Sequence, residues 1–247
     1  MKYWKLTVIA VLAYLFFMLY LVPAAWFVHW LGLPANIQLS QVQGTLWQGS
    51  AMVAQYQSLQ FQQLRWQFNG WSLLRLAPQV NVTAGSIGER EQPYVSASVA
   101  YSVSGLEIEQ ALVRLPVSQL LPLLKLPLPV SATGELMIEV QEFQQGKPWC
   151  SSLAGNASWL DARLQPPTGT WLDLNSIVAD LRCQDGSPVL ITDGNNSLGL
   201  AVTAAVENNR LTVNGSLKPE ARLPQEVHQA MQFVGRPDEQ GRYTIRF

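Results

Sequence analysis

The chain has 247 residues, of which 48% are hydrophobic and 13% are charged, and its formal net charge is −1. Since ordinary soluble domains contain about 25% charged residues, this charge content is low, and it lacks the positive excess that general nucleic-acid binding requires. The abundance of apolar and aromatic residues also excludes an intrinsically disordered chain.

The first predicted element is an apolar helix at the amino terminus. Leu6–Val22 contains no charged residue, and two lysines precede it. We therefore predict a cytoplasmic tail at 1–5 and a membrane-spanning helix at 6–25, with the rest of the chain exported by the positive-inside rule. Two alternatives remain open. One is a signal peptide cleaved near Val22-Pro23-Ala24, and the other is a buried core helix.

Most of the remaining chain predicts a mainly β fold, because apolar and polar residues alternate with period two. The spacing of the segments indicates a long, twisted, mostly antiparallel sheet with one buried face and one wet face. The expected strands fall within 52–56, 64–68, 80–82, 95–103, 136–140, 172–174, 189–191, 198–202, 211–213 and 243–247. The expected turns are Asn69-Gly70, Asp193-Gly194, Asn208-Asn209 and Asn214-Gly215.

Two segments interrupt the alternation and predict one or two short helices. Leu112–Leu124 is rich in leucine and contains two prolines, so a short helix there could cover the open face of the sheet. Pro224–Val234 has an amphipathic pattern. Between them, Leu126-Pro127-Leu128-Pro129 is the expected boundary between two halves of the exported region, at 35–125 and 130–247.

The two cysteines, Cys150 and Cys183, lack the spacing of a redox motif or of a metal site. Because an exported chain meets an oxidising environment, we predict a disulfide between them. The alternative is a pair of unrelated buried thiols.

No constellation of catalytic residues is recognisable. The two histidines, His29 and His228, fall at the expected membrane interface and on an expected solvated helix, and no phosphate-binding glycine motif is present. Carboxylate pairs such as Glu89/Glu91 and Glu107/Glu109 are best explained as solvated side chains. We therefore predict a non-enzymatic protein without a metal or another cofactor.

Several motifs resemble protein N of the type II (general) secretion systems. In chain order they are Val42-Gln43-Gly44-Thr45-Leu46-Trp47-Gln48-Gly49, Leu64-Arg65-Trp66, Ser72-Leu73-Leu74, Gly155-x-x-x-Trp159-x-x-Ala162 and Gly241-Arg242-Tyr243-Thr244-Ile245. The resemblance covers nearly the whole chain. A more distant similarity, at the level of fold alone, links it to AsmA-like proteins with β-grooves implicated in lipid handling.

This resemblance implies a protein of the bacterial inner membrane, with a single anchor and two β halves in the periplasm. Its expected role is that of an accessory component of the secretion machinery that contacts other secretion subunits through exposed strand edges or loops. The alternative is a periplasmic groove that binds lipid or another apolar ligand. Tryptophans that could line such a groove are Trp66, Trp71, Trp159 and Trp171.

Overall fold

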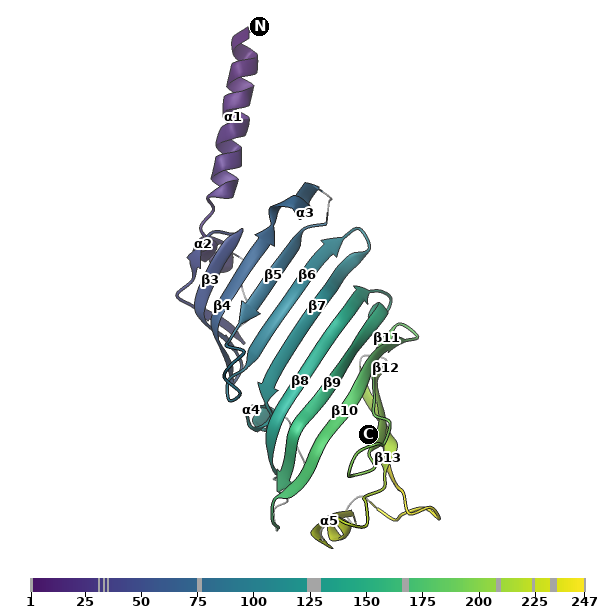
Figure 1. The fold of residues 1–247 in the computed structure, drawn as a ribbon. Helices are drawn as coiled ribbons and strands as arrows, with labels where there is room; N and C mark the ends of the chain where they lie inside the picture. Colours follow the sequence, from purple (N-terminus) through teal and green to yellow (C-terminus); the bar gives the residue numbers. More distant parts are fainter. Residues whose placement is uncertain are drawn as a thin grey trace.

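The structure is a computed structural model. It describes residues 2–30, 32, 34, 36–74, 77–123, 130–165, 169–207, 210–223, 225–231 and 235–246. Figure 1 shows a single curved sheet with a helix, α1 (Lys2–Tyr20), that projects from one end of it. The boundary predicted at Leu126–Pro129 lies outside the described residues, as does the predicted turn at Asn208-Asn209.

The amino-terminal segment forms two helices where a single helix at 6–25 was predicted. α1 ends at Tyr20, and α2 (Ala24–Trp30) begins after Pro23. Proline has no backbone N–H group to continue a helix, and here Pro23 forms an isolated β-bridge with Thr45. Within the described part of the chain, no helix combines the length and the apolarity needed to cross a membrane, so the predicted membrane-spanning helix is not supported.

The mainly β, antiparallel character of the fold is confirmed. The strands are β1 (Ile37–Ser40), β2 (Gln43–Gly44), β3 (Gln48–Tyr56), β4 (Leu59–Asn69), β5 (Gln79–Ala84), β6 (Tyr94–Ser102), β7 (Gly105–Pro116), β8 (Ser131–Gln145), β9 (Cys150–Gln165), β10 (Leu172–Gln184), β11 (Ser187–Ile191), β12 (Ala201–Glu207), β13 (Arg210–Leu217) and β14 (Tyr243–Arg246). They form one sheet in the order β1-β3-β4 and onward to β14, with β2 paired to β3 beside this path. Nearly every strand therefore pairs with its neighbour in the sequence.

The two faces of the sheet differ in polarity along its whole width. Directly paired residues point to the same face, so the strand register identifies the rows that run across the sheet. One row, on what we call the apolar face, consists of Gly49, Trp66, Val82, Ala97, Ala111, Val140, Gly155, Leu181, Leu190, Ala204 and Val213. The adjacent row, on the polar face, consists of Ser50, Arg65, Thr83, Ser96, Leu112, Glu139, Asn156, Asp180, Ile191, Thr203, Asn214 and Arg246.

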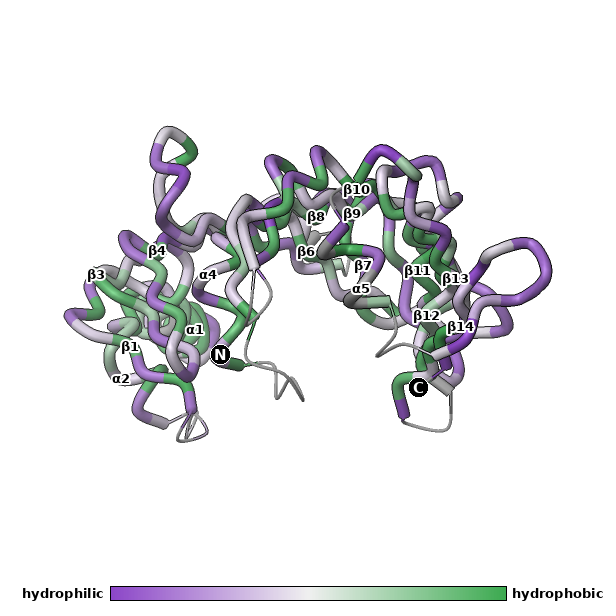
Figure 2. Tube along the Cα trace, turned by 90° about the horizontal axis from the view of Figure 1, so that it is seen from below, coloured by the Kyte–Doolittle hydropathy of each residue, from purple (hydrophilic) through white to green (hydrophobic). Residues whose placement is uncertain are grey.

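Short helices lie along this sheet. α3 (Gly70–Leu74) follows β4, α4 (Val117–Leu120) continues into a 3₁₀ turn, η1 (Leu121–Leu123), and α5 (Gln225–Ala230) precedes β14. α4 and α5 fall in the two segments predicted to be helical, whereas α3 begins at Gly70, where only a turn was predicted. Figure 2 shows the sheet as an arch, with α4 and α5 on its inner side.

The densest core lies between α5 and strands β9 and β10. Val227 of α5 is 2% exposed and packs with Leu172, Leu174, Ile177 and Ala162. Ile177 and Leu181 lie on the same face, because they are four positions apart in β10 and side chains alternate between the faces of a strand. The apolar face is therefore the inner side of the arch.

The predicted strands and turns differ from the structure in several places. β1, β2, β7 and β9 lie outside every predicted strand. Asn214-Gly215 is not a turn but lies inside β13, where Gly215 faces Val202. A Cβ atom on Gly215 would come within 2.3 Å of the Ala201 carbonyl oxygen, so the glycine permits close approach of the two backbones. The strand predicted at 198–202 begins only at Ala201, because the residues before it belong to the loop after β11.

Candidate apolar groove beside the amino-terminal helices

The motif Gly44–Gly49 forms the tight connection between β2 and β3. Gly44 has a φ angle of +89°, and a Cβ atom there would lie 2.5 Å from the Gln48 carbonyl oxygen, so only glycine fits without strain. The Thr45 N–H group donates to that same oxygen at 2.8 Å and closes the turn. The motif is thus explained by backbone geometry.

The same turn attaches the helices to the sheet. The Leu46 N–H group donates to the Val22 carbonyl oxygen at 3.1 Å, beside the bridge between Pro23 and Thr45. Ala24, the first residue of α2, is 1% exposed. The direction in which α1 leaves the sheet is therefore set by contacts of the β2–β3 turn.

Trp66 of β4 is held against this turn from the apolar face. Its indole N–H group donates to the Leu46 carbonyl oxygen at 3.1 Å. Its ring covers Gly49, where an added Cβ atom would lie 2.2 Å from the ring. On the next apolar-face position of β4, the ring of Phe68 meets Trp47 edge-on at a centroid distance of 5.9 Å.

These elements line an open hollow of about 220 Å³ that we call the apolar groove. Its lining comes from α2, β1, the β2–β3 turn, β4 and β5, and every lining residue is apolar: Ala24, Phe27, Val28, Leu39, Leu46, Leu64, Trp66, Phe68 and Val80. Such a surface offers no hydrogen-bond partner to a polar ligand, which favours a hydrocarbon occupant.

The polar face carries hollows of a different character. One hollow of about 470 Å³ and another of about 680 Å³ share Asn81 and Thr83. Their linings are dominated by amide and hydroxyl side chains, which are already solvated on a wet sheet face. The apolar groove is therefore the more distinctive of the two kinds of hollow.

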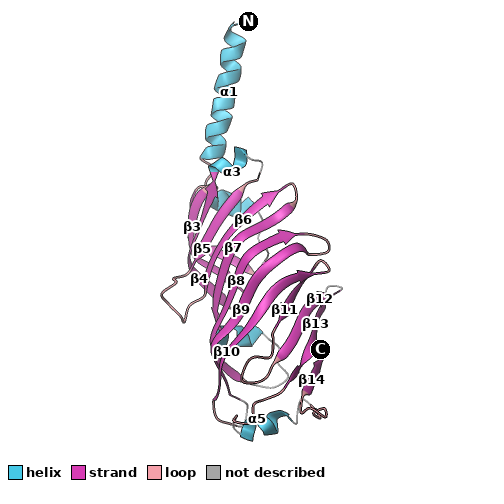
Figure 3. Ribbon diagram, turned by 45° about the vertical axis from the view of Figure 1, so that its right-hand side comes forward, coloured by secondary structure: helices cyan, strands magenta, loops and turns pink. Residues whose placement is uncertain are grey.

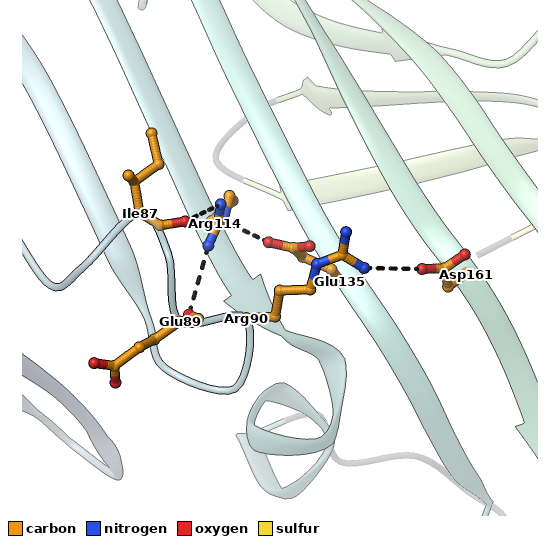
Figure 4. Close-up of polar contacts among 6 residues, drawn as sticks. All are labelled: Ile87, Glu89, Arg90, Arg114, Glu135 and Asp161. Atoms are coloured by element: carbon orange, nitrogen blue, oxygen red, sulfur yellow. Dashed lines mark hydrogen bonds and ion pairs between the residues drawn. The ribbon is translucent and has the colours of Figure 1, made fainter.

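A cluster of charged residues fastens the loop after β5 onto the polar face (Figure 4). The Arg114 guanidinium pairs with Glu135 and donates to the Ile87 carbonyl oxygen at 2.9 Å. The side chains of the ion pair are only 12% and 15% exposed. Nearby, Arg90 and Asp161 form a 3.7 Å pair that is largely in solvent. The buried pair is structural, since each charge is satisfied by the other.

Two carboxylates that were expected to be solvated also accept hydrogen bonds. The Ser102 and Ser104 hydroxyl groups each donate to Glu107 at 2.8 Å, and these bonds lower the pKa of that carboxyl group. Gln79 donates to Glu109 at 2.6 Å. These partners are neutral side chains on the sheet surface. The two carboxylates therefore do not form an acid/base pair with each other.

The sequence-predicted disulfide is present in the structure. Cys150 begins β9 and Cys183 lies near the end of β10, and their sulfur atoms are bonded. The bond links the end of the β8–β9 turn to the start of the β10–β11 turn. It lies several strands away from the apolar groove, which is lined by β1, β4 and β5.

The four tryptophans proposed for a groove divide into two pairs. Trp66 lines the apolar groove, and Trp159 packs against the core under α5. Trp71 and Trp171 are 78% and 46% exposed and take no part in either site. The alternation in the sequence could identify the strands that carry these tryptophans, but not the helix that packs against each ring.

Both histidines are exposed.

Comparison with known proteins identifies a family over most of the chain. Residues 35–246 match the family model described as type II secretion system (T2SS), protein N. The protein named type II secretion system protein N of Aeromonas hydrophila is 36% identical over 243 residues, covering 95% of this chain and 93% of its own length.

Two further relatives carry the same name. The Vibrio cholerae serotype O1 protein is 30% identical over 218 residues, covering 87% of this chain and 85% of its own. The Klebsiella pneumoniae protein is 28% identical over 255 residues, covering 98% and 95%. No solved structure matches the chain. The resemblance in the sequence motifs is confirmed, and the chain belongs to the family of type II secretion system protein N.

Proposed function

We propose that the protein is a non-enzymatic accessory component of type II secretion, attached to the bacterial inner membrane and contacting other secretion subunits in the periplasm. Family membership supports the secretion role. α1 supports the attachment, because after Thr7 its exposed side chains are apolar or aromatic on all sides, including Ile9 and Phe16 at about 60% exposure. A helix of this kind favours lipid surroundings over water.

The observation that carries the proposed contact is the open edge of the sheet at β14. Among the described strands, β14 pairs with β13 on one side only. Such an edge presents unpaired N–H and C=O groups and can accept an added strand from another protein. Figure 3 shows α1 and the β13–β14 region at opposite ends of the molecule.

The number of strands also gives the length of the sheet between α1 and the open edge at β14. Twelve spacings separate β1 from β14 along the sheet, and at about 4.8 Å each they amount to roughly 58 Å along the curve. An anchor at one end would therefore hold the open edge well away from the membrane surface.

The experiment is photocrosslinking in cells with a benzoylphenylalanine residue at Thr244 of β14. Thr203 of β12 is the matched control, because both threonines are exposed on the polar face but β12 is paired on both sides. We expect adducts with a secretion subunit from Thr244 and few from Thr203. Equal adduct yields at both positions, or no protein adduct at Thr244, would contradict contact through the edge.

A second candidate function is the binding of lipid or another apolar ligand by the arched sheet. The observation in its favour is the row of apolar residues on the inner side, which runs from Gly49 in β3 to Val213 in β13. The partners expected under this function are a lipid and the inner membrane. Transfer of labelled lipid between vesicles, with bovine albumin as a non-specific control, would test it. Transfer no faster than with albumin would count against it.

A further inference from the structure

We infer that the apolar groove is a binding site for one acyl chain of a membrane phospholipid. This inference rests on the proposed attachment of α1 to the membrane. It deepens that proposal, because it names the ligand and the place where the ligand enters. Three features of the groove support it: the chemistry of its lining, its position and its continuity with the rest of the apolar face.

The lining selects hydrocarbon. A bound peptide would bury N–H and C=O groups that need hydrogen-bond partners, and the groove lining provides only apolar surface. The one polar atom of its largest side chain, the Trp66 indole nitrogen, is already bonded to Leu46. A cavity of about 150 Å³ with such a lining is known to stay dry and to hold benzene. The groove, at about 220 Å³, is large enough for part of an alkyl chain.

The position of the groove brings it to the lipid. Its roof is α2, which follows α1 after Leu21, Val22 and Pro23 and is fixed to the sheet at Thr45. Trp26 and Trp30 on α2 are 79% and 82% exposed, and exposed amphipathic rings suit the interface between headgroups and acyl chains. The nearest source of hydrocarbon is therefore the bilayer around α1.

The groove also continues into the apolar face. Trp66 lines the groove and belongs to the apolar row, where its direct partner is Val82, followed by Ala97. A chain longer than the groove can therefore keep apolar contact along the arch. The headgroup would remain in the interface beside α2.

The experiment uses the full chain reconstituted in phosphatidylcholine vesicles in which a fraction of the lipid carries a diazirine on one acyl chain. After irradiation, labelled peptides are mapped by mass spectrometry. We expect labelling of α1 and of the peptides that contain the groove residues of β4 and β5. Labelling of α1 without the groove would overturn this inference alone, whereas absence of labelling on α1 would overturn the proposed membrane attachment.

Two variants make the test specific. Val80→Trp fills the groove, and Val178→Trp adds the same ring at a site of β10 that is 53% exposed on the polar face. We expect at least tenfold less labelling of the groove in Val80→Trp and unchanged labelling in Val178→Trp. Val28→Phe narrows the groove from α2 and serves as a second variant should Val80→Trp fail to fold. Undiminished labelling in a folded groove variant would overturn the assignment.

Discussion

Two helices cover the same apolar face of the sheet in different ways, one in each half of the molecule. At the carboxyl-terminal end, α5 inserts Val227 against β9 and β10, and the residues beneath it, including Leu174 at 2% exposure, are buried. At the amino-terminal end, α2 buries Ala24 but leaves the apolar groove between itself and β4 and β5. A helix over a sheet can therefore complete a core or form the roof of a cavity.

This difference indicates that one half of the fold contributes mainly to stability, whereas the other half leaves room for a ligand. The carboxyl-terminal half also has the disulfide, which joins the ends of β9 and β10 that lie away from the core under α5. The amino-terminal end places its unfilled volume beside the helix that we assign to the membrane. We therefore expect substitutions at the two ends to have unequal effects on unfolding.

The largest effect should come from removing the disulfide. Replacing both Cys150 and Cys183 with serine opens a crosslink that spans 33 residues, and the chain-entropy model gives a loss of about 3–4 kcal/mol. Urea denaturation of the oxidised protein and of the variant measures the loss. If the wild-type protein has the same midpoint with and without reductant, the crosslink contributes nothing.

The next largest effect should come from removing a buried leucine side chain, and the same substitution can be compared in the core under α5 and in the apolar groove. Leu174→Ala removes a buried side chain from the core under α5 and should cost roughly 3 kcal/mol. Leu39→Ala removes the same atoms from the wall of the apolar groove, which is already open, and should cost under about 1.5 kcal/mol. Chemical denaturation of both variants tests this order. Equal losses would contradict the distinction between a filled core and an unfilled groove.

A third prediction concerns the middle of the sheet, which is held from the polar face. Arg114→Met leaves Glu135 without its partner and releases the loop at Ile87, so we expect a loss of about 2 kcal/mol. This is less than for a fully buried pair, because both side chains keep some solvent contact. Arg90→Met is the control, and its exposed pair should contribute under about 0.5 kcal/mol. A loss in the control as large as in Arg114→Met would contradict the assignment.

The smallest effect should come from the turn beside the groove. Gly49→Ala places a methyl group against the Trp66 ring and the Gln43 carbonyl oxygen and should cost about 1–2 kcal/mol. Gly88→Ala is the matched control, since its nearest neighbour would be the Ser86 hydroxyl oxygen at 3.9 Å. Thermal unfolding of the two variants measures the difference. Equal melting temperatures would show that the ring moves aside freely.

Much of the fold could be predicted from the sequence, because alternation along a strand is a local signal. The segments at 95–103 and 136–140 lie within β6 and β8, and both short helices occur where the pattern breaks. The prediction failed at Asn214-Gly215, because the same residue pair serves a turn and a close approach of two strands. Only the partner strand distinguishes these two uses.

The apolar groove could not be predicted from the sequence. Its lining joins residues as distant as Ala24 and Val80, and no local pattern shows that α2 folds back over β4 and β5. The motif Gly44–Gly49 was recognisable, but its role depends on the bond from Leu46 to Val22 and on the position of Trp66. These contacts become visible only when the chain is folded.

The nearly sequential order of the strands has a consequence for how the protein forms. Because β3 to β14 each pair with the preceding strand, each new strand can add to the strands that have already folded. Contacts that are short in sequence close quickly, so folding can proceed in one direction, from the amino-terminal strands to the carboxyl-terminal ones. Arrested chains of increasing length should gain protease-resistant fragments one strand pair at a time, whereas resistance appearing only at full length would indicate a single concerted step.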